Sequence, residues 1–314
     1  MQQVTVVGSG IIGLTSAIML QKSGFHVKLI AKERYDATLS SKVGAVWFPY
    51  EIQPANKVLY WSKWTYQKYE SELQNGHGVS FINFFSAFND NSNNDWVHQI
   101  PSGKVRKAHS DELPPGIDAA FVAEVPLVEP RLYLPSLFQQ FIIQGGTFEI
   151  RDINSLKTLS LLDQWVVNCT GLGAKALCND TDLRPMRGQI LRTARLKTPS
   201  YGDATEKGAL SYVINRSQDT IIGGTDDVDN WNLEPEPSDS ELIINRFQEK
   251  SGTKSTPKIL ETLVGLRPMR SAVRFDFDQT FPNIFHNYGH GGAGFTVAWG
   301  CAKELSEILS ASIS

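Results

Sequence analysis

The first thirty residues carry the clearest hydrophobic pattern in the chain. A run of β-branched residues from Val4 to Val7 leads into glycines at positions 8, 10 and 13, and the helix-prone residues 14–22 follow. Gly24 interrupts that helix, and the mainly apolar residues 26–30 indicate a second strand. The pattern predicts a strand, a tight glycine turn, a helix and another strand, in this order.

The remaining chain alternates between helical and extended patterns. Apolar residues at 134, 137, 138, 141 and 142 have the spacing of an amphipathic helix. Ser238, followed three residues later by Glu241, predicts the N-cap of another helix. Helices are predicted at 56–74, 132–144, 238–250 and from 293 or 294 to 309, and strands at 79–88, 121–125, 147–151, 165–171, 187–193, 210–214 and 220–225.

This order predicts an α/β fold in which a parallel sheet is interrupted and later extended. Strands 147–151 and 165–171 are expected to rejoin the sheet that the first two strands begin, and the strands between 187 and 225 to form an antiparallel sheet. The expected nucleotide-binding domain is discontinuous, and the other segments form a second domain. The boundaries are 1–50, 127–187 and 280–314 for the first domain, and 51–126 and 188–279 for the second.

Composition narrows the class of protein. The 314 residues are 41% hydrophobic and 20% charged, and the formal net charge of −3 argues against electrostatic binding to nucleic acid or to an acidic membrane surface. Three cysteines without a CxxC motif favour a reducing compartment, and the apolar runs are too short to span a membrane. The glycine turn begins seven residues after Met1, which leaves no room for a signal peptide. We expect a soluble, cytoplasmic protein.

The Gly-x-Gly-x-x-Gly spacing in the first turn has a chemical meaning. Gly8 permits the turn, Gly10 permits close approach to a pyrophosphate, and Gly13 permits tight packing of helix on strand. Glu33 follows the second strand, where an acid can accept hydrogen bonds from a ribose. A coincidental glycine turn is the alternative, and the strand–helix–strand context favours a dinucleotide. This segment alone does not distinguish NAD from FAD.

A second stretch, residues 264–274, places Arg267, Arg270 and Arg274 among apolar neighbours. Such an arginine either forms an ion pair with an acidic residue or presents a fork to a carboxylate or phosphate. The sequence leaves both interpretations open.

A third stretch has four glycines between 289 and 294, at the start of the last helix. A second glycine-rich helix start favours a longer ligand held at two places, and therefore FAD over NAD. His286 and His290 are four residues apart, but the glycines make a helix between them improbable, so we expect no metal site and assign both histidines structural hydrogen bonds.

Several of these motifs, taken together, resemble the FAD-dependent D-amino acid oxidases of the D-amino acid and D-aspartate oxidase family. The similarity is collinear from residue 3 to about residue 309. It is carried by residues 6–14 (VVGSGIIGL), 46–50 (VWFPY), 168–171 (NCTG), 187–189 (RGQ), 223–225 (GGT) with Trp231, 265–270 (GLRPMR) and 286–292 (HNYGHGG).

The resemblance implies a Rossmann-type FAD-binding domain with a parallel sheet, joined to an antiparallel-sheet substrate domain. It assigns the substrate carboxylate to Arg267 and Tyr212, and the substrate amino group to the carbonyl of Gly292. Around the substrate side chain it places Phe48, Tyr50, Val46 and Ile214. The FAD contacts that it implies are Gly8, Gly10, Ile11, Ile12, Gly13, Lys32, Glu33, Arg34, Ser40, Ser41, Gly44, Ala45, Val46, Ile153, Thr170, Gly171, Gly291, Gly292, Ala293, Gly294, Phe295 and Thr296.

The chain departs from this family at the loop that covers the pocket. Some relatives have a tyrosine four residues before the position of Tyr212, where this chain has Gly208. Tyr201, farther up the same loop, is the candidate replacement. Lys207 is the one cation on this loop that could receive an acidic substrate side chain.

The activity implied is oxidative deamination of D-amino acids to 2-oxo acids and ammonia. Hydride passes from Cα to flavin N5, and O2 then reoxidises FAD and yields H2O2. The mainly apolar pocket predicts neutral D-amino acids. The alternatives are a D-aspartate oxidase, another amine or glycine oxidase, a dehydrogenase that passes electrons elsewhere, or a flavin-binding protein without catalysis. A small-molecule D-amino acid and O2 are the expected partners. The sequence leaves the oligomeric state open, with a homodimer among the alternatives.

Overall fold

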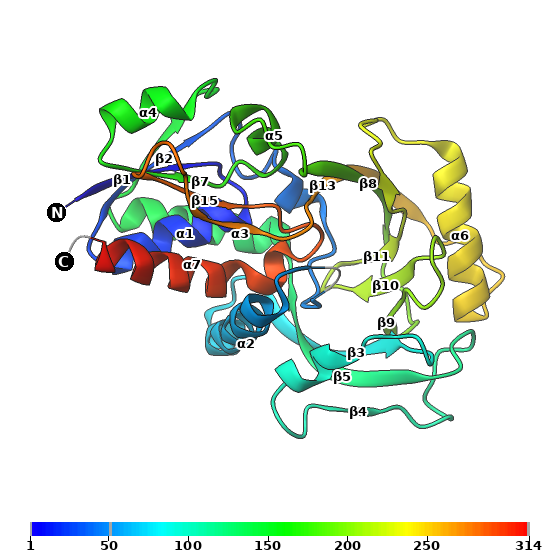
Figure 1. The fold of residues 1–314 in the computed structure, drawn as a ribbon. Helices are drawn as coiled ribbons and strands as arrows, with labels where there is room; N and C mark the ends of the chain where they lie inside the picture. The colour runs from blue at the N-terminus through cyan, green and yellow to red at the C-terminus, as the bar shows by residue number, and fades with distance from the viewer. Residues whose placement is uncertain (1, 50–51, 313–314) are drawn as a thin grey trace.

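The structure, a computed structural model, describes residues 2–49 and 52–312. Figure 1 shows a parallel sheet with its helices at one end of the molecule and a second, larger sheet at the other. The mixed α/β architecture with one parallel and one antiparallel sheet confirms the predicted fold class. Its helices are α1 (Ile11–Lys22), α2 (Ala55–Glu72), α3 (Pro130–Ile143), α4 (Leu156–Leu162), α5 (Ala174–Leu177), α6 (Pro237–Ser251) and α7 (Gly294–Ala311), and the short 3-10 turns are η1 (Leu39–Lys42), η2 (Leu73–Asn75), η3 (Asp95–Gln99) and η4 (Gly171–Gly173).

The first sheet forms around the opening strand. Its order is β14-β15-β7-β1-β2-β6, and every described neighbouring pair is parallel except β14 with β15. The strands are β1 (Gln3–Val7), β2 (His26–Ala31), β6 (Thr147–Ile150), β7 (Trp165–Asn168), β14 (Arg274–Phe277) and β15 (Ile284–Tyr288). Since β1 lies between β2 and β7, the chain passes to opposite sides of β1, and such a sheet has its ligand crevice outside the carboxyl ends of these strands.

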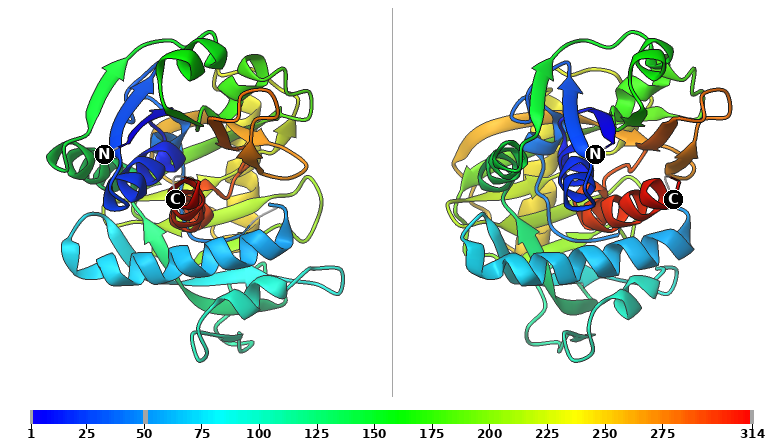
Figure 2. Two further views of the ribbon diagram at one scale, coloured as in Figure 1. Left: turned by 60° about the vertical axis from the view of Figure 1, so that its left-hand side comes forward. Right: turned by 90° about the vertical axis from the view of Figure 1, so that its left-hand side faces the viewer.

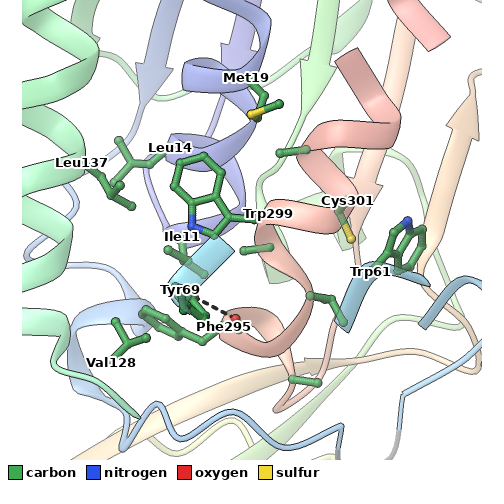
Figure 3. Packing of buried hydrophobic residues seen from close by; sticks show 14 of the residues in the cluster. Ile11, Leu14, Met19, Trp61, Tyr69, Val128, Leu137, Phe295, Trp299 and Cys301 are labelled. Atoms are coloured by element: carbon green, nitrogen blue, oxygen red, sulfur yellow. Dashed lines mark hydrogen bonds between the residues drawn. The ribbon is translucent and has the colours of Figure 1, made fainter. Parts of the chain in front are cut away.

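Helices α1, α7 and α2 form the apolar layer beneath this sheet. Both views in Figure 2 show α1 and α7 side by side, with α2 crossing α7. Gly300 makes the crossing possible, because a Cβ there would lie 2.2 Å from the Cα of Trp61. Trp299 is fully buried near Leu14 and Leu137 (Figure 3). Burial of each such large apolar side chain stabilises the fold by about 1.5–3 kcal/mol.

The second sheet has the order β12-β8-β11-β10-β9-β3-β5-β4, and β13 pairs with β8. Its described pairs are antiparallel except β3 with β9. The strands are β3 (Val79–Ala87), β4 (Val105–Lys107), β5 (Ala120–Val128), β8 (Arg184–Ala194), β9 (Ser200–Asp203), β10 (Ser211–Asn215), β11 (Asp219–Gly223), β12 (Asp227–Val228) and β13 (Ile259–Met269).

Side-chain alternation gives the two faces of this sheet different partners. Leu191, Val213 and Ile222 belong to an apolar cluster with Ile243 and Phe247 of α6. The neighbours one position along the strands belong to the main core instead; among them are Ile190, Ile214 and Ile221. The period of two therefore gives one face to α6 and turns the other toward the main core of the molecule.

The predicted elements are confirmed, with shifted ends. The first helix begins at Ile11, directly after the glycine turn, and the helix predicted at 56–74 is α2 followed by the turn η2. The Asn-rich segment 90–95 lies in the mostly exposed loop after β3. Strand β14 and helix α4 are short, and the sequence pattern did not indicate them.

The predicted N-cap of α6 is wrong. The helix begins at Pro237, Glu236 occupies the N-cap, and Ser238 lies inside the first turn. Proline fits this first position because it has no N–H to leave unpaired. Gln189 sets the start, since its side chain accepts the N–H of Glu236 at 2.8 Å and donates to the Glu236 carbonyl at 2.8 Å.

The division into two domains stays a prediction, and sheet membership differs from the expected boundaries. Residue 127 lies inside β5, residue 188 lies inside β8, and both strands belong to the second sheet. Strand β14 belongs to the first sheet, although 188–279 was expected in the second domain.

Candidate active site

The loops that leave the parallel strands contain most of the predicted cofactor residues. Gly8 follows β1, Lys32 follows β2, Thr170 follows β7 and Gly289 follows β15. Because carboxyl ends of parallel strands meet at one edge of a sheet, these segments share one crevice.

The first glycine turn has the geometry that the sequence predicts. A Cβ on Gly13 would lie 1.8 Å from the Gly8 carbonyl oxygen, and a Cβ on Gly8 would lie 2.3 Å from the Cys169 oxygen. Gly8 also has φ +114°, which favours glycine. At the start of helix α1 the N–H of Ile11 donates to the Ser40 hydroxyl, and the N–H groups of Gly10, Ile12 and Gly13 are available to an anion. The residues present therefore fit the pyrophosphate of a dinucleotide.

The charged residues after β2 face solvent. Lys32 lies 3.8 Å from the Asp152 carboxylate, and Arg34 forms an ion pair with Asp36. Glu33 is exposed, and its backbone carbonyl accepts the Ser9 hydroxyl at 2.6 Å. Within the part of the chain that the structure describes, the two cations are thus paired with other acids, and the Glu33 carboxylate is left to a ligand.

The segment from 40 to 48 connects the glycine turn to the second sheet. Ser40 accepts the N–H of Ile11 at 3.0 Å, whereas the Ser41 hydroxyl donates to carbonyls of its own loop. Ala45 accepts the N–H of Val128, and Val46 forms a bridge with Leu127 of β5.

The same segment contacts the last helix. Phe48 donates its N–H to the Thr296 hydroxyl at 3.1 Å, and that hydroxyl donates to the Phe48 carbonyl at 2.8 Å. Phe295 and Ala293 are buried, and Gly294 begins α7. Residues 44–48 and the start of α7 therefore lie together, as the cofactor prediction requires. Tyr50 lies outside the described residues.

The adenine-side candidates lie beyond β6 and β7. Thr170 donates its hydroxyl to Asn168 at 2.8 Å, and a Cβ on Gly171 would meet no atom within 4 Å. Ile153 is half-buried in the loop after β6. The space beside Gly171 leaves the backbone accessible.

Residues 289–294, which we call the glycine loop, lie next to the arginine strand β13. Gly291 donates its N–H to the carbonyl of Pro268 at 2.9 Å. Gly292 is exposed, and a Cβ on Gly291 would meet no atom within 4 Å. The loop therefore presents open backbone beside Arg267.

The two histidines are buried in hydrogen-bonded surroundings. His286 Nε2 lies 3.0 Å from Asp278 and its Nδ1 lies 3.2 Å from the Asn168 amide, while His290 Nε2 lies 3.7 Å from the Cys301 sulfur. Burial lowers the pKa of His290 to about 3, so this side chain is neutral. No group of three or more metal-ligating side chains is present in residues 2–49 and 52–312.

Arg267 differs from the other arginines of its stretch. Arg270 pairs with Asp180 at 3.0 Å, and Arg274 lies 3.2 Å from Asp276. Arg267 is half-buried, and it has no carboxylate of the described chain within ion-pair distance. Its Nη1 donates to the Thr225 carbonyl at 2.9 Å. The guanidinium is thus oriented by a backbone carbonyl and keeps its charge for a ligand.

Glycines make the surface on which these side chains lie. A Cβ on Gly188 would be 2.5 Å from Nη1 and Nη2 of Arg267, and a Cβ on Gly223 would be 2.4 Å from the Tyr212 ring. Gly223 is paired with Tyr212 and with Ile190, and Gly188 lies on the same strand as Ile190, two residues before it. Arg267 and Tyr212 therefore occupy the same face of the second sheet.

Electrostatics couples the two side chains. Burial raises the pKa of the Tyr212 hydroxyl, and the Arg267 guanidinium opposes part of that rise. The Tyr212 hydroxyl is therefore protonated at neutral pH and can donate a hydrogen bond. Ile214, two residues along β10, has its Cδ1 2.5 Å from the position of a Cβ on Gly44. This contact places Ile214 against the predicted flavin segment.

The proposed replacement for the pocket-covering tyrosine is wrong. Tyr201 is fully buried in the cluster that faces α6, its register partner is Val213, and its hydroxyl lies 3.5 Å from Ser211. It therefore points to the opposite face from Tyr212. Lys207 is exposed, on the loop between β9 and β10.

Sequence reasoning missed the residues that support the two arginines. Gly188 and Thr225 contact Arg267, and Asp180 pairs with Arg270; none was predicted as a site residue, because each acts on a residue far away in the sequence. One signal was available: Gly188 and Gly265 face one another in the β8–β13 pair, and two facing glycines leave room for a large side chain to cross.

Comparisons with known proteins agree with this geometry. The family model described as FAD dependent oxidoreductase (DAO) matches residues 3–308. A D-amino-acid oxidase of Rubrobacter xylanophilus is 34% identical over 320 residues, covering 98% of this chain and 96% of the relative. A D-amino-acid oxidase of Streptomyces coelicolor is 34% identical over 322 residues, covering 98% and 97%.

The fold is similar to the crystal structure of glycine oxidase from Geobacillus kaustophilus. The TM-score is 0.82 at 14% identity, with 98% of this chain and 95% of that chain covered. At this identity the likeness concerns the fold alone. The family match, however, runs from the first strand into the last helix and includes both sheets, and the chain therefore belongs to the FAD dependent oxidoreductase family.

Proposed function

We propose that this protein catalyses the oxidative deamination of D-amino acids to 2-oxo acids and ammonia, with release of hydrogen peroxide. One observation carries the proposal. Arg267 presents a half-buried guanidinium that has no carboxylate partner in the described chain, beside Tyr212 and next to the glycine loop. The D-amino-acid oxidases that are 34% identical to this chain supply the substrate class.

Arg267 and Tyr212 bind the substrate carboxylate in this account. A guanidinium matches a carboxylate with two parallel hydrogen bonds, and the Tyr212 hydroxyl donates a third. Each hydrogen bond to a charged group is worth about 1.5–3 kcal/mol. The carbonyl of Gly292, on the exposed part of the glycine loop, accepts a hydrogen bond from the substrate amine. These contacts fix two substituents of Cα and so decide which hand of amino acid has its Cα hydrogen directed at the cofactor.

The residues proposed to hold FAD are those of the crevice. The first glycine turn and α1 hold the pyrophosphate, Glu33 and Thr170 lie on the adenosine side, and the glycine loop with residues 44–46 holds the ring system. Bound FAD supplies the oxidation chemistry, as acceptor of a hydride and donor of electrons to O2. The protein contributes orientation, since no side chain has to remove a proton from Cα in such a reaction.

A neutral substrate side chain fits the pocket best. Phe48, Val46 and Ile214 supply apolar surface on the proposed side-chain side. A second carboxylate, from D-aspartate, would lose its hydration against this apolar surface and gain no polar partner among these three side chains. Lys207 argues against this preference, because its cation could receive an acidic substrate side chain. A higher kcat/KM for D-aspartate than for D-alanine would overturn the proposed preference for neutral side chains.

The proposal also includes a cytoplasmic location and a homodimeric assembly. The three cysteines are free, as a reducing compartment allows. Exposed Trp231 and Leu233 lie on the loop before α6 and offer apolar surface for a second copy. No helix of the described chain is long and apolar enough to cross a membrane. Light scattering of the purified protein tests the dimer.

A panel of D- and L-amino acids, scored by peroxide release, tests the activity. The expected result is peroxide from neutral D-amino acids and none from their L-enantiomers. Peroxide from glycine alone, or from L-amino acids, would replace this function by that of another amine oxidase. The purified protein could instead be yellow but release no peroxide, and D-amino acids could fail to reduce its flavin in the absence of oxygen. That result would show a flavin-binding protein without catalysis.

A further inference from the structure

Two strand ends carry the proposed chemistry, and they belong to different sheets. Strand β13 of the second sheet carries Arg267, and β15 of the first sheet leads into the glycine loop. Catalysis requires that the group holding the substrate and the group holding the flavin keep a fixed separation. The contacts that join these two strand ends therefore set the reaction geometry.

Asp180 joins them. Its Oδ2 accepts the Tyr288 hydroxyl at 2.7 Å and the Arg270 Nε at 3.0 Å. Tyr288 directly precedes the glycine loop, and Arg270 lies three residues after Arg267. The Asp180 side chain is 6% exposed and Tyr288 is 1% exposed, so water does not compete for these bonds.

The other carboxylate oxygen fixes Asp180 itself. Oδ1 accepts the backbone N–H groups of Asp182 at 3.1 Å and Leu183 at 3.2 Å. The carboxylate thus receives four donors from three segments of the chain. Burial alone would raise the pKa of Asp180, but Tyr288 and Arg270 hold it below its ordinary value, so the group is ionised at neutral pH.

Arg270 extends the connection to the glycine loop. Its Cβ and Cδ lie 3.0 Å from the position of a Cβ on Gly289, and its Nη1 donates to the Ala272 carbonyl at 2.8 Å. Together with the bond from Gly291 to Pro268, these contacts connect the first three residues of the glycine loop to the end of β13 and to Arg270, which follows it.

We propose that Asp180 is a positioning residue that fixes the distance between the substrate held by Arg267 and the ring held by the glycine loop. This inference rests on the proposed function. Asp180 touches neither ligand and acts through Arg270 and Tyr288.

Asp180→Asn is the direct test. An amide has one oxygen, so whichever way the new side chain lies, two of the four donors face an NH2 group. Arg267 keeps its own supports at Thr225 and Gly188, so binding of the carboxylate persists while the ring shifts relative to it. We expect kcat for D-alanine to fall at least tenfold and KM to change less than threefold.

Three further measurements separate positioning from stability. Propionate, which has the carboxylate but no amine to oxidise, is titrated against the flavin absorption, and its Kd should change less than threefold in Asp180→Asn. The affinity of the apoprotein for FAD should fall, because the glycine loop loses the Tyr288 contact. Asp182→Asn is the matched control: the 41% exposed Asp182 accepts Ser271 and lies 3.8 Å from Arg270, but it has no contact with Tyr288, and its amide oxygen still accepts, so kcat should stay within twofold.

Tyr288→Phe removes one donor and keeps the carboxylate, and it replaces Asp180→Asn if that variant does not fold. It should lower kcat by a smaller factor, with KM unchanged. Unchanged kcat in either folded variant, or a loss confined to KM, would overturn the positioning role. A wild-type protein that oxidises no D-amino acid would instead overturn the proposed function; the propionate and FAD affinities then still decide whether Asp180 links the two sites.

Discussion

The backbone N–H of Gly291 donates to the carbonyl of Pro268 at 2.9 Å. Pro268 directly follows Arg267, and Gly291 directly precedes Gly292. This bond therefore places the proposed carboxylate-binding residue of one sheet next to the proposed amine-binding residue of the other. The consequences of disturbing this arrangement can be measured.

Arg267→Ala should raise KM for D-alanine about a hundredfold, because two charged hydrogen bonds of about 1.5 kcal/mol each are lost. The flavin should stay bound, since Arg267 is on the second sheet. Steady-state kinetics and the visible spectrum check both. Arg184→Ala is the control, because Arg184 forms an exposed pair with Asp229. An unchanged KM would remove Arg267 from the site.

Gly188→Ala should lower kcat/KM while leaving the fold intact. The new Cβ would lie 2.5 Å from the Arg267 guanidinium, which must move by on the order of 1 Å, and such a displacement costs about a hundredfold in rate. The displaced group is the end of a flexible side chain, so the unfolding midpoint should change little. Gly146→Ala offers the opposite case, because its Cβ would meet the ring of the core residue Phe141 at 2.3 Å. It should lower stability and retain activity; the reverse pattern would refute the arrangement.

Gly13→Ala should abolish FAD binding and destabilise the apoprotein. Its Cβ would meet the Gly8 carbonyl oxygen at 1.8 Å, so strand β1 and helix α1 must separate. Gly294→Ala, with an ordinary contact of 3.6 Å to Ile11, should leave the melting temperature close to that of the wild type. Equal melting temperatures for all three proteins would argue against the tight turn.

Stability should fall in mild acid because two histidines are buried uncharged. Burial lowers the pKa of His290 to about 3, and burial also lowers that of His286 against an opposing effect of Asp278. Below about pH 6.5 the unfolded chain binds a proton at His290 that the folded chain does not, so His290 lowers the free energy of unfolding by about 1.4 kcal/mol per pH unit, and His286 acts in the same direction.

Urea unfolding between pH 7 and pH 4.5 checks this slope. His290→Gln should be less stable at pH 7 and show a flatter decline, with the remainder due to His286. Parallel curves for the two proteins would contradict the assignment. Asp180 affects stability at lower pH than the histidines do. Its pKa is held below the ordinary value, so the stabilisation by its carboxylate is present above about pH 4 and is lost as the pH falls further.

The sequence predicted what depends on local pattern. The strand and glycines from Val4 to Gly13 determine their own turn, and the period-two segments of β8, β10 and β11 determine their own faces. It did not predict the start of α6, because Gln189, 47 residues away, selects Glu236 as the N-cap. It misplaced Tyr201 for a related reason, since the register with Val213 decides which face that side chain occupies.

The candidate site was likewise predicted only in part from the sequence. Motif resemblance pointed to Arg267 and Tyr212, and the structure brings them to one face. The residues around them form contacts across strands that are far apart in the sequence, as Thr225 and Asp180 do. A single sequence holds no periodicity for such contacts, and only the three-dimensional arrangement reveals them.

The most direct test of the account is reduction of the bound flavin without oxygen. The purified yellow protein is mixed anaerobically with D-alanine or with L-alanine, and the visible absorption is followed. The account predicts that D-alanine bleaches the flavin, that L-alanine does not, and that Arg267→Ala requires about a hundredfold more D-alanine. A flavin that D-alanine leaves oxidised, or that both enantiomers reduce equally, would contradict it.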